Sequence, residues 1–191
     1  MIGCIIQARM GSSRLPGKTL IKLDESRSTL DFVVNQLSFS TLIDKTIIAT
    51  TSLEQDDIIE KNAKTLGIDC FRGSSDDVLD RYYHCAKKFQ INTVVRITSD
   101  CPLIDPQIVD DVIRKYQHED YDYVTNTLNR SYPIGTDVEI FSFEILEKTW
   151  QKAILPSERE HVTLFIKNKK LEFKLGDLKN SKNLGNLRWT L

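Results

Sequence analysis

Cysteine is scarce in this sequence, and the spacing of the few cysteines excludes common metal motifs. The four cysteines among 191 residues, Cys4, Cys70, Cys85 and Cys101, form no C-x-x-C pair. Three of them lie in or beside apolar runs, where a small buried thiol is the usual finding. We therefore expect no zinc site, and a protein that works in a reducing compartment.

Long hydrophobic runs and a strong net charge are also missing. The first apolar run is only a few residues long and is interrupted by Gln7 and Arg9. No run approaches the ~18 residues that span a membrane, and nothing near the N-terminus resembles a signal peptide. The formal net charge of -1 disfavours a non-specific nucleic-acid binder. We therefore expect a cytoplasmic protein whose partners include neither a membrane nor a nucleic acid.

Two familiar phosphate-binding motifs, G-x-x-x-x-G-K-[ST] and G-x-G-x-x-G, do not follow the first strand, which disfavours a P-loop hydrolase. A different loop is present there. It carries two glycines, two serines and three cations, namely Arg9, Gly11, Ser12, Ser13, Arg14, Gly17 and Lys18. Backbone N–H groups, hydroxyls and fixed positive charge can together replace the water around a polyphosphate. We hypothesise that the loop binds a nucleoside triphosphate; the alternative is a surface loop with solvated cations.

The first half of the chain alternates strands and helices. After the first strand, helices are expected at residues 28–42, 53–66, 76–89 and 107–116, and strands at 45–50, 68–71 and 93–97. This alternation predicts an α/β fold with a mainly parallel sheet and helices on both faces, and a ligand crevice at the carboxyl ends of the strands. Residues 9–18 and 99–105 both follow such strand ends. If the strands that precede these two segments are neighbours in the sheet, we expect Asp100 to face whatever Arg9 and Lys18 hold.

The second half has a different pattern. Strands at residues 121–126 and 138–141 flank a loop at 127–137, and a helix is expected at 143–152. A capping box from Ser157 to Glu160 predicts a helix through Asn168. Late strands are expected at 171–175 and 187–191. Because the chain stops inside an apparent strand, we expect that native sequence continues beyond Leu191.

Asp100 is the candidate metal ligand. An aspartate at a strand end, opposite a cationic phosphate loop, suits magnesium-assisted nucleotidyl transfer, because Mg²⁺ prefers one or two carboxylates together with phosphate oxygens. The metal would neutralise the triphosphate and act as a Lewis acid, while nearby cations would stabilise the departing pyrophosphate. The alternative for Asp100 is a turn residue that precedes Pro102.

The motifs resemble a known family when they are taken in order along the chain. They lie at residues 6–18, 49–51, 71–74, 76–83, 96–105, 122–124, 132–139 and 158–163. Together they resemble the sugar-acid cytidylyltransferases, which include the CMP-sialic acid and CMP-Kdo synthetases. The closest similarity is to the branch of spore coat polysaccharide biosynthesis protein F, and it covers essentially the whole chain.

This resemblance implies a Rossmann-like nucleotide-diphospho-sugar transferase fold in a single domain, residues 1–191. Residues 1–117 would form the nucleotide-binding half and residues 118–191 the acceptor-sugar half. The enzyme would transfer CMP from CTP to a sugar acid with release of pyrophosphate, in surface polysaccharide biosynthesis. Mg²⁺ would be the cofactor, and a homodimer built through the second half is plausible by resemblance.

The resemblance also implies roles for individual residues. Arg9, Lys18 and Asp100 would be catalytic, and Asp100 would bind Mg²⁺. The nucleotide would be bound by Ala8, Arg9, Gly11, Ser12, Ser13, Arg14, Lys18, Thr50, Thr51, Arg72, Ser74 and Arg81. The alternative for Arg72 and Arg81 is that they are solvated cations beside a helix.

For the acceptor we predict contacts from Asp137, Glu139, Arg159 and His161. Asp137 and Glu139 alternate with Val138 and so face one side of a strand, which is either the acceptor side or a wet face. His161 is either an acid–base group, a common role of histidine, or a structural residue. A sugar carboxylate needs a cation, for which Arg130 and Arg159 are candidates.

One departure from the family pattern bears on activity. In the family the last strand is followed closely by an acidic residue that is thought to complete the magnesium site, and this chain ends before it. One alternative to the cytidylyltransferase is therefore a non-catalytic module that binds CTP or CMP. Another is a nucleotidyltransferase that uses a different nucleoside triphosphate, because the phosphate loop does not contact the base. The sequence does not identify the sugar.

Overall fold

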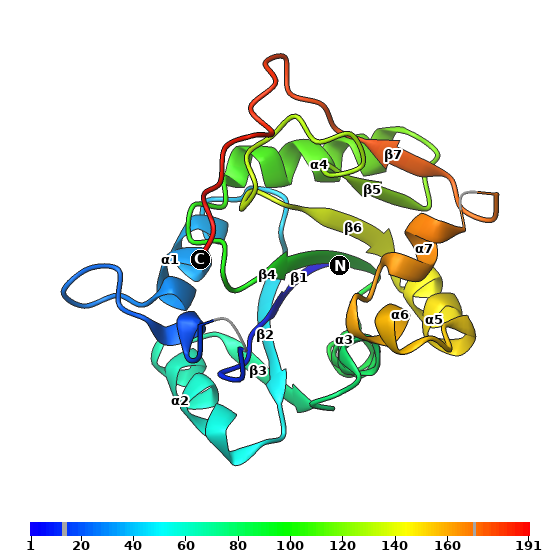
Figure 1. Cartoon of the computed structure of the whole chain (residues 1–191). Helices are drawn as coiled ribbons and strands as arrows, with labels where there is room; N and C mark the ends of the chain where they lie inside the picture. The colour runs from blue at the N-terminus through cyan, green and yellow to red at the C-terminus, as the bar shows by residue number, and fades with distance from the viewer. Residues whose placement is uncertain (13–14, 170) are drawn as a thin grey trace.

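A seven-stranded sheet forms the centre of the molecule in the computed structural model, which describes residues 1–12, 15–169 and 171–191 (Figure 1). The strand order is β3-β2-β1-β4-β6-β5-β7. The strands are β1 (Ile2–Gln7), β2 (Lys45–Thr51), β3 (Asp69–Gly73), β4 (Thr93–Thr98), β5 (Tyr123–Thr125), β6 (Glu139–Ser142) and β7 (Leu175–Asp177). β6 is antiparallel to both neighbours, and the other pairings are parallel. The predicted α/β fold with a mainly parallel sheet is confirmed.

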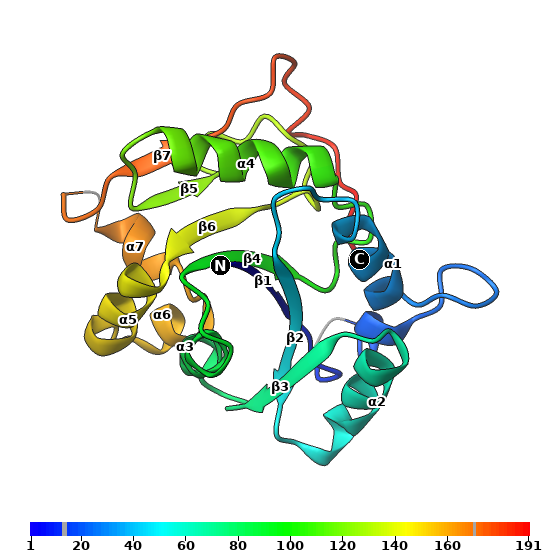
Figure 2. The same cartoon turned by 180° about the vertical axis from the view of Figure 1, so that it is seen from behind.

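Helices cover both faces of this sheet (Figure 1 and Figure 2). One face carries α1 (Thr29–Leu37), α2 (Asp57–Thr65) and α4 (Pro106–His118), and the other carries α3 (Val78–Lys88), α5 (Phe143–Lys152), α6 (Pro156–Glu160) and α7 (Leu164–Asn168). Because successive strand side chains point to opposite faces, Ile5 and Ile47 pack in one core while Ile6 and Ile48 pack in the other. Each fully buried aliphatic side chain contributes about 1.5–3 kcal/mol.

The pairing of β1 with β4 positions the candidate site. Gln7, the last residue of β1, is the register partner of Thr98, the last residue of β4. The loop that follows β1 and the loop that follows β4 therefore leave the sheet from the same edge. A parallel sheet places the carboxyl ends of its strands together, so Arg9 and Asp100 come close although they are far apart in the sequence.

β4 also connects the two predicted halves of the chain. It pairs antiparallel with β6, and Arg96 of β4 is the register partner of Glu139 of β6. The sheet thus continues without interruption from the first half into the second. Of the helices in the described ranges, none is long and apolar enough to cross a membrane.

The first helix is shorter than the sequence predicts. α1 ends at Leu37 rather than at residue 42. The segment that follows is tied to α4, because the Ser40 hydroxyl donates to Asp110 Oδ1 at 2.5 Å and the Thr41 N–H donates to Asp110 Oδ2 at 3.0 Å. The prediction used only the local helical pattern of apolar residues. The hydrogen bonds to Asp110 override that pattern and end the helix earlier.

The helix predicted at residues 157–168 is two helices. α6 begins at Pro156, and Glu158 accepts a hydrogen bond from the Leu155 N–H at 3.3 Å. The predicted capping box is therefore displaced, with Glu158 rather than Glu160 in the capping role. α6 is separated from α7 at Val162, whose φ of 44° is incompatible with a continuous helix.

Both late strands were predicted wrongly. β7 begins at Leu175 and pairs with β5, whereas Leu171 is exposed outside it. In the final segment, the described residues make one isolated bridge, between Arg188 and Ile134. The alternating apolar side chains Leu187 and Trp189 are exposed. The alternation of apolar residues in this segment therefore does not mark a strand with one buried face.

Candidate active site

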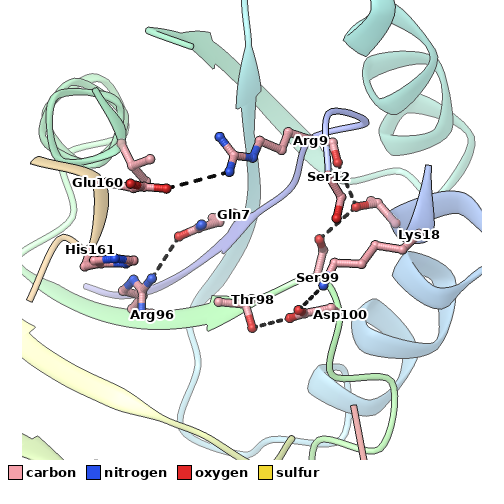
Figure 3. Close-up of a pocket in the computed structure, with 12 residues that line it drawn as sticks. Gln7, Arg9, Ser12, Lys18, Arg96, Thr98, Ser99, Asp100, Glu160 and His161 are labelled. Carbon is pink, nitrogen blue, oxygen red and sulfur yellow. Dashed lines mark hydrogen bonds and ion pairs between the residues drawn. The ribbon is translucent and has the colours of Figure 1, made fainter. Parts of the chain in front are cut away.

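A polar cleft of about 400 Å³ lies at the carboxyl ends of β1 and β4. Its walls come from the end of β1 and the loop after it, from β4 and the loop after it, from the start of α3 and from the end of α6 (Figure 3). The lining residues are Gln7, Arg9, Ser12, Lys18, Thr19, Val78, Arg96, Thr98, Ser99, Asp100, Glu160 and His161. The three residues predicted to be catalytic are therefore brought together, and we treat this cleft as the candidate active site.

Lys18 and Asp100 form the central pair of the cleft. Lys18 Nζ lies 2.5 Å from Asp100 Oδ2, and the Thr98 hydroxyl donates to Asp100 Oδ1 at 2.7 Å (Figure 3). Burial by itself would raise the pKa of Asp100, but the hydrogen bonds from Lys18 and Thr98 outweigh it and hold that pKa below its usual value. Asp100 is thus an anionic carboxylate, as a metal ligand must be.

Arg9 lies at the opposite side of the cleft and is loosely held. Its guanidinium is 4.0 Å from the Glu160 carboxylate, and the two side chains are 44% and 54% exposed. Its backbone is more firmly fixed, because the Thr19 hydroxyl donates to the Arg9 carbonyl at 3.1 Å and also contacts the Ser99 hydroxyl at 3.1 Å. An exposed ion pair at this distance contributes little stability, so the Arg9 side chain is free to exchange Glu160 for an anionic ligand.

The turn that presents Lys18 depends on a glycine. Gly17 has a φ of 73°, in the left-handed region, and it precedes the 3-10 turn η1 (Lys18–Leu20). Residues other than glycine adopt this conformation at a cost. The Gly17 N–H also donates to the Met10 carbonyl at 2.9 Å, which closes the loop on itself. Ser13 and Arg14, both predicted nucleotide ligands, lie outside the described residues.

Thr51 and Asp56 support the loop from behind. Asp56 Oδ1 accepts a hydrogen bond from the Met10 N–H at 2.7 Å, and Asp56 Oδ2 accepts one from the Thr51 hydroxyl. Thr50 is completely buried. Both threonines were predicted to bind the nucleotide. In the structure they lie behind the loop and are not among the residues that line the cleft.

The remaining predicted loop residues are close to the cleft or at its edge. Ala8 is buried, and its N–H donates to the Ala49 carbonyl at 3.1 Å. Gly11 lies next to Gln55, whose amide nitrogen would be 3.2 Å from a Cβ at that position. Ser12 lines the cleft directly.

Arg72, Ser74 and Arg81 lie around the end of β3 and the start of α3, outside the lining of the cleft. Arg72 pairs with Asp57 at 2.5 Å and with Glu60 at 3.1 Å, and these hydrogen bonds raise its pKa. The Ser74 carbonyl accepts a hydrogen bond from Arg81, which is 0% exposed. Arg81 is therefore not a solvated cation.

A second cavity of about 350 Å³ adjoins the cleft. It is lined by Arg96, Thr98, Thr127, Arg130, Asp137, Glu139 and Lys167. Arg96 and Thr98 line both spaces. Asp137 and Glu139 face this cavity together, in agreement with the alternation around Val138. Because Thr98, which donates to Asp100, lines both spaces, this cavity is the candidate acceptor subsite.

Glu139 is the centre of a buried charge network in the second cavity. It is 4% exposed and accepts hydrogen bonds from Tyr123 at 2.5 Å, from Thr163 at 2.7 Å and from Lys167 at 2.7 Å. It also pairs with Arg96. Burial alone would raise the pKa of Glu139, but Arg96 and Lys167 hold it well below its usual value. Glu139 is therefore ionised at neutral pH, and its oxygens are already occupied.

This network fixes Arg96 at the boundary between the two spaces. While one side of the guanidinium pairs with Glu139, its Nη2 donates to the Gln7 side-chain oxygen at 3.0 Å. The pKa of Arg96 is raised because Glu139 outweighs the effect of burial. The positive charge of Arg96 thus lies between the cleft and the second cavity.

The two arginines predicted to bind a sugar carboxylate lie in different places. Arg130 lines the second cavity and makes two hydrogen bonds to Asp137, at 2.7 and 2.8 Å. Arg159 instead pairs with Asp77 at 2.6 Å and donates to the Trp150 carbonyl at 2.7 Å. Arg159 joins α6 to the start of α3 and to α5. Among the described residues, those that line the cleft and the second cavity do not include Arg159.

His161 lines the cleft and is followed by a strained residue. Val162 is 1% exposed, and its φ of 44° is an outlier for a β-branched side chain. This turn directs His161 toward the cleft, while Thr163 on its other side donates to Glu139. The strained residue thus lies between His161, which lines the cleft, and Thr163, which donates to a residue of the second cavity.

Several lining residues were missed by the sequence reasoning: Gln7, Thr19, Arg96, Thr98, Ser99, Thr127, Glu160 and Lys167. Gln7, Thr98 and Ser99 lie at the carboxyl ends of predicted strands, where the sequence analysis placed the ligand crevice, so they could have been predicted. Arg96 is a single charge inside an apolar strand, which is also unusual enough to be noted. For Lys167 the local sequence offers no signal.

The donor set for a metal is small. No group of three or more His, Cys, Asp or Glu side chains that could hold a metal ion occurs among the described residues. Asp100 is ionised and lies beside the phosphate-loop cation Lys18. A single carboxylate of this kind fits a Mg²⁺ ion that is bound largely through phosphate oxygens and water, and does not fit a metal held only by protein.

Sequence relatives are consistent with this geometry. Residues 3–186 match the sequence model of a family described as cytidylyltransferase. The chain is 39% identical over 162 residues to the uncharacterized protein MJ1063 of Methanocaldococcus jannaschii, across 85% of this chain and 65% of that protein. It is 37% identical over 171 residues to the spore coat polysaccharide biosynthesis protein SpsF of Bacillus subtilis, across 86% and 69%. The chain thus spans about two thirds of the length of these relatives.

Solved structures share the fold. A cytidylyltransferase from Leptospira borgpetersenii superposes with a TM-score of 0.95 at 36% identity, over 100% of this chain and 80% of that one. A CMP:2-keto-3-deoxy-manno-octonic acid synthetase in complex with CTP superposes with a TM-score of 0.74 at 15% identity, over 98% and 93%. At the lower identity the likeness shows the fold alone. The predicted Rossmann-like nucleotidyltransferase fold and the family resemblance are both confirmed.

Proposed function

Because the chain belongs to the cytidylyltransferase family, we propose that it transfers CMP from CTP to a sugar acid with release of pyrophosphate. The observation that carries this proposal is the Lys18–Asp100 pair, 2.5 Å apart in a polar cleft where two parallel strands end. A cation and an ionised carboxylate side by side provide one group for phosphate and one for a divalent cation. A role in surface polysaccharide synthesis is supported by the name of the SpsF relative.

In this proposal the triphosphate is bound along the loop after β1. Lys18 and Arg9 neutralise phosphate oxygens, and Arg9 releases its weak contact with Glu160 when it does so. Gly11 and Ser12 supply backbone N–H and hydroxyl donors in the same loop, together with Ser13 and Arg14. The base extends toward the ends of β2 and β3 and the first turn of α3, where Thr50, Thr51, Arg72, Ser74 and Arg81 lie.

Asp100 is the residue that would hold a divalent cation, for which we propose Mg²⁺. Its lowered pKa keeps it anionic at neutral pH. When bound, the ion would neutralise the triphosphate and act as a Lewis acid. Thr98 orients the carboxylate by donating to Oδ1 at 2.7 Å, so one face of Asp100 is fixed by the protein.

The acceptor hydroxyl attacks the α-phosphorus of CTP in line with the departing pyrophosphate. A new bond forms between that oxygen and the α-phosphorus, the bond to the bridging oxygen of the β-phosphate breaks, and the hydroxyl proton is released. Lys18 and Arg9 stabilise the negative charge that develops on the pyrophosphate. The main contributions of the protein are thus positioning and electrostatics rather than covalent catalysis.

The second cavity is where we propose that the sugar acid binds. Its cations, Arg96, Arg130 and Lys167, suit a carboxylate, and Asp137 suits sugar hydroxyls. His161 extends from α6 into the neighbouring cleft, where it can contact the acceptor. A homodimer built through the second half stays a prediction.

The test is pyrophosphate release by the 191-residue protein, with CTP, UTP, ATP and GTP in turn and a panel of keto-acid sugars in the presence of Mg²⁺. We expect release with CTP and at least one acidic sugar, and none with the corresponding neutral sugars. Measurable CTP binding without release for any acceptor, also for a C-terminally extended protein, would instead support a non-catalytic module. Release with another nucleotide in preference to CTP would contradict the base assignment.

A further inference from the structure

The segment at residues 184–191 is held by its backbone rather than by buried side chains. The side chains of Leu187, Trp189 and Leu191 are all exposed. The Leu187 carbonyl instead accepts a hydrogen bond from the Ile134 N–H at 2.9 Å, and the Trp189 N–H donates to the Ile134 carbonyl at 2.7 Å. The burial of apolar side chains therefore contributes little to the position of this segment.

The end of this segment contacts the backbone of Asp100, the candidate metal ligand. The Thr190 hydroxyl donates to the Asp100 carbonyl at 2.7 Å, and the Leu191 N–H donates to the same oxygen at 3.2 Å. Lys18 Nζ donates to the Leu191 carbonyl at 3.2 Å. The red end of the chain accordingly lies beside the loop that follows β4 in Figure 1. The Asp100 carboxylate is held separately, by Lys18 and Thr98, so residue 100 is held at both its side chain and its carbonyl.

A glycine allows the segment to lie in this position. Gly135 has a φ of 106°, in the region that favours glycine. A Cβ at residue 135 would lie 2.7 Å from the carbonyl carbon and oxygen of Trp189, and 3.0 Å from the Thr190 nitrogen. These are backbone atoms, which cannot rotate out of the way as the end of a side chain can. A side chain at residue 135 would therefore displace Trp189 and Thr190.

The segment connects the second cavity to the cleft. Near its start, the Leu184 N–H donates to the Ser131 carbonyl at 2.8 Å, in the loop at 127–137 that contributes to the lining of the second cavity. At its end it holds Asp100. Of the described residues that line the cleft, none comes from this segment. It can therefore act on the cleft only through the residues that it holds.

We propose that the segment 184–191 positions Asp100 for metal binding, with Thr190 as the positioning residue. The Thr190 hydroxyl fixes the carbonyl of residue 100, and thereby the backbone from which the carboxylate extends. Mg²⁺ demands near-ideal geometry from its ligands, so a small displacement of this backbone weakens the contribution of Asp100. The inference rests on the proposed function, because it takes Asp100 as the ligand of a divalent cation.

The first test needs no ligand. Amide hydrogen exchange is measured for peptides that contain residues 99–104, in wild type, Thr190→Val and the matched control Thr65→Val. Thr65 is exposed on α2, and its hydroxyl donates to the Lys61 carbonyl at 3.1 Å. We expect exchange in this loop to become about 2- to 10-fold faster in Thr190→Val, the effect of one hydrogen bond on a local opening, and to stay unchanged in Thr65→Val. Unchanged exchange in Thr190→Val overturns the inference.

The second test separates positioning from a purely structural role. Titration calorimetry measures CTP affinity with Mg²⁺ and with EDTA, and the ratio of the two is the gain due to the metal. We expect Thr190→Val to lower this gain by about 2- to 10-fold and to leave the metal-free affinity unchanged, and Asp100→Asn to lower the gain at least as much. An unchanged gain in Thr190→Val overturns the inference. An equal loss of affinity with and without Mg²⁺ also overturns it.

A second variant keeps the inference testable if Thr190→Val does not fold. Gly135→Ala is compared with Gly67→Ala, because Gly67 also has a left-handed φ, of 69°, but a Cβ there meets nothing within 4 Å. Both substitutions place a side chain on an unfavourable backbone, and only Gly135→Ala displaces the segment. We expect a lower metal-dependent gain in Gly135→Ala than in Gly67→Ala, and equal gains overturn the inference.

The proposed function can fail separately in these experiments. Failure of wild type to bind CTP, or an unchanged metal-dependent gain in Asp100→Asn, would contradict the proposed function itself. The exchange measurement is independent of both results, because it reports directly on whether Thr190 holds the loop that carries Asp100.

Discussion

The cleft and the second cavity are both rich in charge, but they differ in how that charge is held. In the cleft, the Arg9–Glu160 pair is long and half-exposed, at 4.0 Å. In the second cavity, Glu139 is buried and bonded by four partners, and Arg130 donates two hydrogen bonds to Asp137. The Arg9 contact can be exchanged for a ligand, whereas the charged side chains of the second cavity already hold one another in place.

This difference indicates a division of labour. A flexible, incompletely paired cation can follow a triphosphate as it binds and leaves. A buried network in which Glu139 has four partners keeps its geometry, and so it can hold Arg96 in one orientation between the two spaces. Preorganised charge stabilises a transition state without reorganisation during the reaction. The predictions below test this contrast, and they run from the largest expected effect to the smallest.

The largest effect is expected from Glu139→Gln. Removing one partner of a buried ion pair leaves the opposite charges uncompensated, which costs about 3–5 kcal/mol. Arg96 and Lys167 would both lose their anionic partner. We therefore expect the free energy of unfolding, measured by urea denaturation, to fall by about this amount.

The matched control for this variant is Glu119→Gln. Glu119 pairs with Lys115 on the surface at 2.7 Å, and exposed pairs contribute about 0–1 kcal/mol. Similar losses for Glu139→Gln and Glu119→Gln would refute the claim that the second cavity is a rigid framework.

Removal of the central pair of the cleft should have the next largest effect. Lys18→Ala and Asp100→Asn each delete a group that we place at the reacting phosphates. We expect each to lower turnover by about 10²-fold or more, which corresponds to about 2.7 kcal/mol of transition-state stabilisation. Steady-state pyrophosphate release is the measurement. Near-wild-type turnover of either variant, with folding retained, would rule out this site.

The dependence of stability on pH should distinguish the wild type from Glu139→Gln. The pKa of Glu139 is lower in the folded protein than its usual value of 4.5. The unfolded chain therefore binds a proton more readily, so the stabilisation is present above pH 4.5 and is lost as the pH falls toward the folded pKa. We expect wild type to lose more stability than Glu139→Gln between about pH 5 and pH 3. Parallel pH profiles would show that Glu139 is not held ionised by its partners.

Part of this arrangement was predictable because it depends on sheet topology. Parallel strands end at one edge, so the loop with Arg9 and Lys18 and the loop with Asp100 were expected to meet. That expectation used the alternation of strands and helices. The expectation also depended on the two strands being neighbours, which the local sequence does not encode and which the strand order supplies by placing β1 directly beside β4.

What could not be predicted depends on partners that are distant in sequence. Arg96 meets Glu139 because β4 pairs with β6 in one register, 43 residues apart. Arg159 was a candidate for the sugar carboxylate, but its partner Asp77 lies 82 residues away. The break between α6 and α7 at Val162 occurs without glycine or proline, so no local turn signal indicated it.

Arg159→Ala should have a moderate effect that is confined to stability. The guanidinium makes charged hydrogen bonds to Asp77 at 2.6 and 2.8 Å and holds α6 against α3. Hydrogen bonds to charged groups contribute about 1.5–3 kcal/mol, so we expect a loss within or somewhat below this range. The acceptor KM should change far less than in Arg130→Ala, whose side chain lines the second cavity. An equal rise in the acceptor KM for both variants would show that Arg159 contributes to acceptor binding and contradict this prediction.

The smallest effect is expected from Glu160→Gln. The Arg9–Glu160 pair is half-exposed and 4.0 Å long, so its removal should change the free energy of unfolding by no more than about 0.5 kcal/mol. Affinity for tripolyphosphate, measured by calorimetry, should rise slightly, because an anion that competes for Arg9 has been removed. The rise should shrink at high salt, where exposed charges are screened. If Glu160→Gln instead destabilised the fold as much as Glu139→Gln, the Arg9 contact would be a fixed structural pair, and the contrast between an exchangeable cleft and a rigid cavity would fail.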